Sequence, residues 1–193
     1  MGLIRVVGGE LRGRRLRVPD RGVRPTSERA REAVFDILGP ARVRGSRVLD
    51  LYAGSGALGI EALSRGAEFA DFAEGNRAVA RTLEENLETL LLAARSRVHV
   101  ADLDRAVLPA AGPWHIVFLD PPYDGDAGER WLRTLAAAAW PPEGGQVVYE
   151  RRSGTEARAP GALVLRTERA YGDAAVAFYQ TGGPDRPSPR GGA

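Results

Sequence analysis

Two short apolar stretches, each ending in a distinctive loop, constrain the fold of this chain more than any other feature. Residues Val48–Gly59 run from an apolar segment into a glycine-rich turn and then into a helical pattern. Residues Val117–Tyr123 form a second apolar segment that ends in Asp-Pro-Pro-Tyr. If both segments are strands of an open parallel sheet, their carboxyl ends meet at one edge, where such sheets bind ligands. The sequence therefore predicts a ligand site that the two loops build together.

The rest of the chain alternates between strand and helix patterns. Apolar stretches typical of strands occupy residues 47–52, 69–74, 97–102, 115–120 and 146–150. Helical patterns occupy residues 57–65, 76–93 and 128–139, and a short helix is expected after Leu103. This alternation predicts an α/β protein whose mostly parallel sheet has helices on both faces. The closing segments Ala162–Thr167 and Ala174–Gln180 flank a turn and predict a hairpin, so the last strand is expected to be antiparallel.

The two ends of the chain differ in composition from the middle. Residues 1–25 alternate loosely around glycines and arginines, which predicts a small basic β-hairpin arm. A helix follows, because Thr26 or Ser27 can cap its start and apolar residues recur every four positions until Gly39. Residues 26–180 are expected to form one domain. Residues 181–193 are mostly Gly, Pro, Ser and Arg, which predicts a disordered tail.

Composition argues against several other classes of protein. The 193 residues are enough to bury the core of one full domain. No segment approaches the roughly 18 apolar residues of a membrane span, and the first residues lack the layout of a signal peptide, so a cytoplasmic location is expected. The chain has no cysteine and only two isolated histidines, His99 and His115. This pattern argues against disulfides and against a metal site.

The glycine-rich turn matches the dinucleotide fingerprint G-x-G-x-x-G, but such a match is weak by itself. A pyrophosphate needs positive potential, whereas Asp50, Glu74 and Asp102 place a carboxylate at the end of three successive strands. Carboxylates repel phosphate and suit S-adenosylmethionine, which carries a sulfonium, an ammonium and ribose hydroxyls. The sequence therefore favours S-adenosylmethionine over NAD. The expected cofactor-binding residues are Asp50, Ala53, Gly54, Ser55, Gly56, Glu74, Asp102 and Leu103, with Arg24 and Thr26 closing over the methionyl end.

The segment Asp120–Tyr123 is either a proline-stiffened turn or a catalytic site for an exocyclic amine. Proline has no backbone N–H, so Pro121 and Pro122 leave carbonyls that can only accept hydrogen bonds. If Asp120 and the Pro121 carbonyl each hold one N–H, the amine can aim its lone pair at a sulfonium methyl, and both acceptors stabilise the cationic transition state. Tyr123 can stack on the base. Because a carboxylate accepts from N1–H and N2–H of guanine together, guanine is favoured over adenine.

Charge is distributed unevenly, although the net charge of the whole chain is only +2. Residues 1–25 hold seven arginines against Glu10 and Asp20, a local charge of +5, whereas residues 26–193 hold 20 arginines against 23 acids. The absence of lysine could come from a GC-rich genome, but arginine also binds phosphate bidentately. The arm is either a solvated hairpin or a contact for a polyanion, and a nearby base-modifying site favours RNA. The expected RNA-binding residues are Arg5, Arg12, Arg14, Arg15 and Arg17.

Together these motifs resemble those of the RsmD family, bacterial class I methyltransferases with a Rossmann-like fold. The likeness covers about residues 3–180 and is carried by the segments Arg5–Gly9, Arg12–Leu16, Arg24–Thr26, Arg29–Glu32, Ala53–Arg65, Asp120–Tyr123, Tyr149–Glu150, Tyr171–Asp173 and Phe178–Tyr179. The resemblance implies a seven-stranded sheet and S-adenosylmethionine as the methyl donor. It also implies that the acceptor is the N2 amine of a flipped guanine in small-subunit (16S) ribosomal RNA.

Three other functions stay open at this stage. The first is a DNA or RNA adenine-N6 methyltransferase, which uses the same Asp-Pro-Pro-Tyr segment. The second is an NAD-dependent oxidoreductase, which leaves that segment unexplained. The third is a non-catalytic RNA-binding module, which has no need for Asp120. The expected partner is ribosomal RNA, either naked or within an assembling small subunit. We expect a monomer that needs neither a metal nor a membrane, in which Glu61 and Glu150 are structural.

Overall fold

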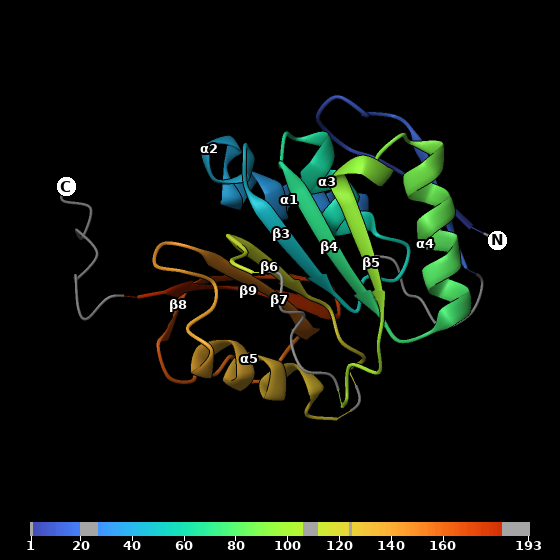
Figure 1. Cartoon of the computed structure of the whole chain (residues 1–193). Helices are drawn as coiled ribbons and strands as arrows, with labels where there is room; N and C mark the ends of the chain where they lie inside the picture. Colours follow the sequence, from blue (N-terminus) through green and yellow to red (C-terminus); the bar gives the residue numbers. More distant parts are fainter. Residues whose placement is uncertain (1, 20–26, 106–111, 124, 183–193) are drawn as a thin grey trace.

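The computed structural model describes residues 2–19, 27–105, 112–123 and 125–182. They form a seven-stranded sheet with helices on both faces, and a two-stranded sheet at the amino end (Figure 1). In spatial order the strands of the large sheet are β5 (Ser96–Val100), β4 (Phe69–Glu74), β3 (Arg47–Leu51), β6 (Ile116–Leu119), β7 (Gln146–Arg152), β9 (Ala174–Thr181) and β8 (Leu163–Tyr171).

All neighbouring strands from β5 to β7 pair in parallel, whereas β9 runs antiparallel to both β7 and β8. A parallel partner requires a crossover connection, and helices provide it from β3 to β4, from β4 to β5 and from β6 to β7. The last two strands need only the tight turn at Gly172, whose left-handed backbone (φ 63°) suits a hairpin. The structure thus confirms the predicted Rossmann-like α/β fold with an antiparallel last strand.

Alternating apolar side chains divide the interior into two cores, one on each face of the sheet. In β3, for example, Val48 packs into one core and Leu49 into the other. The first core is covered by α1 (Glu28–Leu38), α2 (Pro40–Val43), α3 (Ala57–Ser64) and α4 (Arg77–Thr89). The second core is covered by α5 (Ala127–Ala137), which lies alone below the sheet in Figure 1.

Helix boundaries follow local capping signals. The Oγ of Ser27 accepts a hydrogen bond from the amide of Ala30 at 3.2 Å, so α1 begins where its cap predicts. Gly39, with φ 74°, ends α1 as expected, but α2 starts immediately after it. The predicted helix 76–93 is shorter in the structure, because α4 ends at Thr89 and the 3-10 helix η1 (Ala93–Arg95) follows. Residues 106–111, where a short helix was expected, lie outside the described residues.

The amino-terminal arm is a β-hairpin, as predicted, and it packs tightly against the main sheet's helices. Strand β1 (Gly2–Arg5) pairs antiparallel with β2 (Arg15–Val18), and Leu16 is buried. The carboxylate of Glu61 in α3 accepts hydrogen bonds from the amides of Val7 at 2.8 Å and Gly8 at 2.7 Å. Glu61 therefore fixes the arm to α3. Among the helices that the structure describes, none is long and apolar enough to span a membrane.

Candidate active site

The glycine-rich loop and the Asp-Pro-Pro-Tyr segment lie side by side because the strands before them are neighbours. Leu51 at the end of β3 is opposite Leu119 at the end of β6, and the amide of Asp120 donates to the Leu51 carbonyl at 3.4 Å. From β3 the chain proceeds to β4 and β5 on one side, and from β6 it proceeds to β7 on the other. The strand order therefore reverses between β3 and β6, and open α/β sheets bind ligands at such switch points.

The loop between β3 and α3 has an unusual backbone. Tyr52 (φ 60°), Gly54 (φ 55°) and Gly56 (φ 82°) are all left-handed. A Cβ at Gly56 would lie 2.3 Å from a methyl carbon of Leu83 in α4, so this position needs glycine for space as well as for conformation. A left-handed tyrosine is strained by about 1–3 kcal/mol, and strain of this kind clusters at ligand sites. The loop therefore places strained, closely packed backbone at the start of α3.

Asp50 lies beneath this loop. Its Oδ2 accepts a hydrogen bond from the amide of Gly59 at 2.9 Å, and the side chain is buried. Burial raises the pKa of Asp50 to about 7; the Gly59 hydrogen bond opposes this shift, and the charge of Glu74 adds to it. Asp50, predicted as a cofactor-binding residue, thus holds the first turn of α3 against β3. A direct role toward a cofactor stays a prediction.

Glu74 and Asp102 follow the next two strands at the same edge of the sheet. Glu74, the last residue of β4, accepts from the amide of Gly54 at 3.0 Å and from the amide of Asn76 at 2.8 Å. Asp102 comes shortly after β5 and is exposed, and its Oδ1 accepts from the amide of Asp104 at 3.0 Å. The structure therefore brings Glu74 into contact with the glycine-rich loop, whereas Asp102 shapes the following turn.

The other predicted cofactor residues differ in their surroundings. Ala53 is buried beside the loop. Leu103 is buried under α5, and its carbonyl accepts a hydrogen bond from the indole of Trp131 at 3.1 Å. The structure therefore shows Leu103 fixing the position of the segment after β5. Arg24 and Thr26 lie outside the described residues.

Asn86 of α4 connects the glycine-rich loop to the amino-terminal arm. Its side-chain amide donates to the carbonyl of Ser55 at 3.1 Å and to the carbonyl of Arg17 at 2.9 Å. Its Oδ1 accepts from the amide of Arg17 at 2.9 Å. Both Asn86 and Ser55 are buried. No sequence pattern singles out Asn86, because its partners lie 31 and 69 residues away along the chain.

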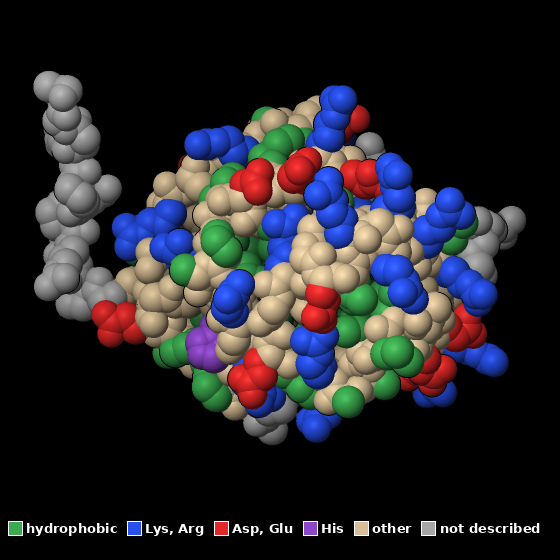
Figure 2. Space-filling model, turned by 90° about the horizontal axis from the view of Figure 1, so that it is seen from above, with side chains coloured by type: hydrophobic (Ala, Val, Ile, Leu, Met, Phe, Trp, Pro, Cys, Tyr) green, Lys and Arg blue, Asp and Glu red, His purple; other side chains and the backbone are tan. Residues whose placement is uncertain are grey.

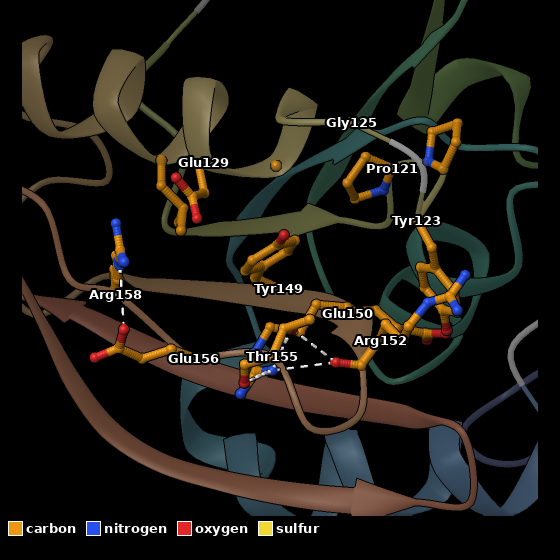
Figure 3. A pocket seen from close by; sticks show the side chains of 14 residues that line it. Pro121, Tyr123, Gly125, Glu129, Tyr149, Glu150, Arg152, Thr155, Glu156 and Arg158 are labelled. Atoms are coloured by element: carbon orange, nitrogen blue, oxygen red, sulfur yellow. Dashed lines mark hydrogen bonds and ion pairs between the residues drawn. The ribbon is translucent and has the colours of Figure 1, made fainter.

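The Asp-Pro-Pro-Tyr segment points its aromatic ring toward the end of β7. Pro121 is buried and Pro122 is exposed. The hydroxyl of Tyr123 donates to Oε1 of Glu150 at 2.9 Å, and the guanidinium carbon of Arg152 lies 6.0 Å from the centre of the Tyr123 ring. Figure 3 shows these side chains converging at one end of a pocket. Glu150, expected to be only structural, thus contacts the predicted base platform.

Two cavities lie next to this segment. The first, here named the α5 pocket, has a volume of about 230 Å³ and is lined by residues that include Tyr123, Gly128, Glu129, Tyr149, Arg152 and Arg158. The second, here named the Asp173 cavity, has a volume of about 420 Å³ and is lined by Tyr123, Arg152, Ser153, Gly172 and Asp173. The two cavities share Tyr123 and Arg152. Of these wall residues, only Tyr123 was predicted as a site residue from the sequence. The others come from α5, β7 and the turns after β7 and β8, which the tertiary structure brings to this corner.

Arginines of the arm fall into two groups. Arg5 pairs with Glu28 at 3.3 Å and Arg17 pairs with Glu85 at 3.4 Å, and both pairs are exposed. The three other predicted RNA-binding residues are Arg12, Arg14 and Arg15. All three are exposed, and none forms an ion pair within the described part of the chain. Figure 2 shows that arginines are spread widely over the face covered by the first helices, with acids between them. Within the described part of the arm, Arg12, Arg14 and Arg15 are therefore the most available cations.

Within the described residues, no three His, Asp or Glu side chains gather in a way that could hold a metal ion. Both histidines have structural partners instead. His99 Nε2 lies 2.9 Å from Oδ1 of buried Asp71, and His115 Nδ1 accepts from the amide of Arg47 at 3.0 Å. The site chemistry in the described part of the chain therefore consists of carboxylates, carbonyls, an aromatic ring and arginines.

Comparison with known proteins identifies the family. A family model described as "Conserved hypothetical protein 95" matches residues 4–180. The chain is 38% identical over 181 residues to ribosomal RNA small subunit methyltransferase D of Escherichia coli K12, covering 93% of this chain and 90% of the relative. The solved structure of yhhF from Escherichia coli superposes with a TM-score of 0.83 at 37% identity, covering 93% of this chain and 98% of that one.

A more distant structure shares the fold alone. The RNA methyltransferase from Salinibacter ruber, solved in complex with S-adenosyl-L-homocysteine, has a TM-score of 0.60 and 16% identity, covering 84% of this chain and 96% of that one. The family match spans nearly the whole described chain, and the named relative aligns over nearly all of both sequences. This chain therefore belongs to the RsmD family, the family of ribosomal RNA small subunit methyltransferase D.

Proposed function

We propose that this protein transfers a methyl group from S-adenosylmethionine to the exocyclic N2 amine of a guanine in small-subunit ribosomal RNA. One observation carries the proposal: the glycine-rich loop after β3 and the Asp-Pro-Pro-Tyr segment after β6 lie next to each other at the switch point of the sheet. Membership of the RsmD family supports the same reaction class and the same class of RNA. The alternative, an adenine-N6 methyltransferase, uses the same arrangement on a different base.

The residues around the glycine-rich loop fit S-adenosylmethionine better than a phosphate-bearing cofactor. Each carboxylate oxygen of Glu74 already accepts one backbone N–H and has a second lone pair, which suits a ribose hydroxyl. Glu74 and Asp102 make the surroundings acidic, and Asp50 adds its charge above its raised pKa of about 7, which suits a sulfonium and an ammonium. Gly54 has no side chain to keep the ligand from the backbone, whereas Gly56 is required by the packing of Leu83 against the loop. When bound, the cofactor supplies the activated methyl group.

The acceptor amine is held by this chain's own oxygen atoms. Asp120 and the carbonyl of Pro121 each accept one hydrogen from the amine, which turns the nitrogen lone pair away from the ring of the base. The backbone of both residues is held before the reaction, that of Asp120 by the hydrogen bond from its amide to the Leu51 carbonyl and that of Pro121 by burial. Fixed acceptors stabilise the positive charge that develops on the nitrogen, an effect worth about 3–4 kcal/mol per group in comparable sites. Tyr123 supports the base by stacking.

The arm supplies the contact with the rest of the RNA. Arg12 and Arg14 lie between the two strands of the hairpin and Arg15 begins β2, and all three are exposed. Phosphate contacts of this kind position a nucleic acid without reading its sequence. Because Asn86 and Glu61 hold the arm against α4 and α3, its cations stay at a fixed distance from the site. The target guanine must leave its stack, at a cost of a few kcal/mol, so a loop nucleotide is the expected target.

Labelled S-adenosylmethionine and small-subunit particles from cells that lack this gene provide the test. Label recovered as N2-methylguanosine, and lost with Asp120→Ala, is the expected result. Label in N6-methyladenosine favours the adenine alternative and keeps the mechanism. If S-adenosylhomocysteine binds but no label enters particles or naked ribosomal RNA, the proposed acceptor is wrong. If S-adenosylhomocysteine does not bind, the proposed reaction is wrong.

A further inference from the structure

The α5 pocket is smaller than a site for a whole cofactor. Its volume of about 230 Å³ is below the roughly 300–1,000 Å³ of most small-molecule sites. Its walls come from the Asp-Pro-Pro-Tyr segment, the first half of α5, the end of β7 and the connection from β7 to β8 (Figure 3). We propose that the pocket binds the RNA nucleotide next to the target guanine, with the base inside and the phosphate at the rim. This proposal rests on the proposed function.

An aromatic surface stands in the middle of the pocket. The ring of Tyr149 projects toward the first turn of α5, as Figure 3 shows. A Cβ at Gly128 would lie 2.2 Å from the Tyr149 hydroxyl oxygen, so only glycine at this position lets the helix pass so close to the ring. The partly buried ring also packs against the core beneath α5. A ring held in place by its neighbours gives an unstacked base a platform without further ordering of the protein.

Two arginines at the rim suit a phosphate. Arg158 pairs with Glu156 at 3.3 Å, but both side chains are largely exposed, so the pair adds little stability and its guanidinium can turn to another anion. Arg152 lies against the face of Tyr123. A third arginine, Arg151, has a different role because it is buried and bound to Glu168. The rim thus carries two planar cations, and planar guanidinium groups bind phosphate oxygens bidentately.

The pocket borders the Asp-Pro-Pro-Tyr segment but lies apart from the glycine-rich loop. The target amine must approach the methyl donor at the glycine-rich loop, and no lining residue of the α5 pocket belongs to that loop in the described structure. Tyr123 and Arg152 form the boundary between the α5 pocket and the Asp173 cavity. If the target guanine stacks on Tyr123 from the side of the Asp173 cavity, the next nucleotide of the RNA strand lies on the other side of the Tyr123 ring. The α5 pocket is the space available there.

The test distinguishes a phosphate contact made by Arg158 from a general effect of positive charge on RNA binding. Ribosomal RNA affinity is measured by filter binding, across a series of salt concentrations, for Arg158→Ala and for Arg166→Ala. Arg166 is an exposed arginine of β8 outside the pocket, so both variants lose one positive charge. Arg158→Ala is expected to weaken binding about fivefold and to reduce the slope of log affinity against log salt by about 0.7, as for one single-stranded phosphate. Arg166→Ala is expected to match the wild type.

A second variant tests the base platform. Tyr149→Leu is expected to weaken RNA binding about tenfold at an unchanged salt slope, because stacking does not release counterions. S-adenosylhomocysteine affinity and melting temperature serve as controls for folding. If Tyr149→Leu does not fold, Glu129→Trp, which fills the pocket from the exposed side of α5, is expected to give the same loss.

Equal effects of Arg158→Ala and Arg166→Ala, or unchanged RNA affinity in the Tyr149 or Glu129 variant, would overturn the proposed subsite. Failure of the proposed function is a separate result, because methyl transfer to guanine is measured with the wild-type protein, whereas the subsite is tested by RNA affinity alone.

Discussion

The hydroxyl of Tyr123 donates a 2.9 Å hydrogen bond to Glu150, which joins the end of the Asp-Pro-Pro-Tyr segment to the neighbouring strand β7. Tyr149, one residue earlier, is opposite Leu119 of β6, so the sheet register brings Glu150 to this corner. Pro121 and Pro122 stiffen the backbone that precedes the ring. The proposed base platform is therefore held from two sides, by its own backbone and by a carboxylate on the next strand.

Removing only the hydroxyl of Tyr123 should show what this bond contributes. Tyr123→Phe keeps the ring and is expected to lower kcat/KM for RNA methylation about tenfold, since a hydrogen bond to a charged group contributes about 1.5–3 kcal/mol and this one is partly exposed. Glu150→Gln keeps an acceptor oxygen and should have a smaller effect. Steady-state transfer of labelled methyl groups measures both. Wild-type kinetics for Tyr123→Phe would show that the bond does not position the ring.

Asp120 should matter for the chemical step and not for cofactor binding. Asp120→Asn retains one acceptor oxygen but loses the negative charge, and kcat is expected to fall by about 10²–10³, as for removal of one fixed transition-state partner. Calorimetric titration with S-adenosylhomocysteine is expected to give the wild-type affinity. A fall in kcat together with an equal loss of S-adenosylhomocysteine affinity would assign Asp120 to the cofactor instead.

The raised pKa of Asp50 predicts a pH dependence of stability. The folded protein holds this proton up to about pH 7, because burial raises the pKa from its usual 3.8 to about 7. The folded state therefore binds more protons than the unfolded state between these values, and stability decreases as pH rises through this window. Asp50→Asn cannot titrate. Urea unfolding of both proteins at pH 4 to 8 should show the wild type losing stability relative to the variant up to about pH 7; parallel curves would contradict the raised pKa.

Asn86 should couple the stability of the arm to that of the glycine-rich loop. Asn86→Ala leaves the buried carbonyl of Ser55 and the backbone of Arg17 without their partner, which is expected to cost about 1–3 kcal/mol for each unsatisfied group. The variant should also bind S-adenosylhomocysteine more weakly, because the loop is no longer fixed. Thr89→Ala, at an exposed position of the same helix, is the matched control. Loss of stability without loss of ligand affinity would limit Asn86 to holding the arm.

The arm should bind RNA mainly through the exposed arginines of its turn. Changing Arg12, Arg14 and Arg15 together to Ala is expected to reduce the slope of log affinity against log salt by about 2, at about 0.7 for each single-stranded phosphate contact. A control variant loses three exposed arginines elsewhere, namely Arg77, Arg81 and Arg97. Filter binding to ribosomal RNA measures both. An equal slope change in the two variants would show that only the total charge matters.

The fold and the two central loops could be predicted from sequence because their signals are local. The apolar run before Gly54 and the run before Asp120 each indicate a strand, and the turn residues after them mark the loop. The length of α4 was less predictable. Its apolar pattern continues past Thr89, but Leu90 and Leu92 are buried outside the regular helix, in the turns that lead to η1.

Sequence by itself determined the order of strands and helices, the family, and the placing of carboxylates at strand ends, because periodicity and turn chemistry depend on near neighbours. Only the tertiary structure decided that Glu150 contacts Tyr123, that Asn86 links Ser55 to Arg17, and that Asp50 turns toward Gly59. The contacts of Glu150 and Asn86 join elements far apart in the chain, and that of Asp50 depends on how α3 packs on β3. They depend on which strands become neighbours and how closely each helix packs on the sheet, and the packing of the whole core sets both.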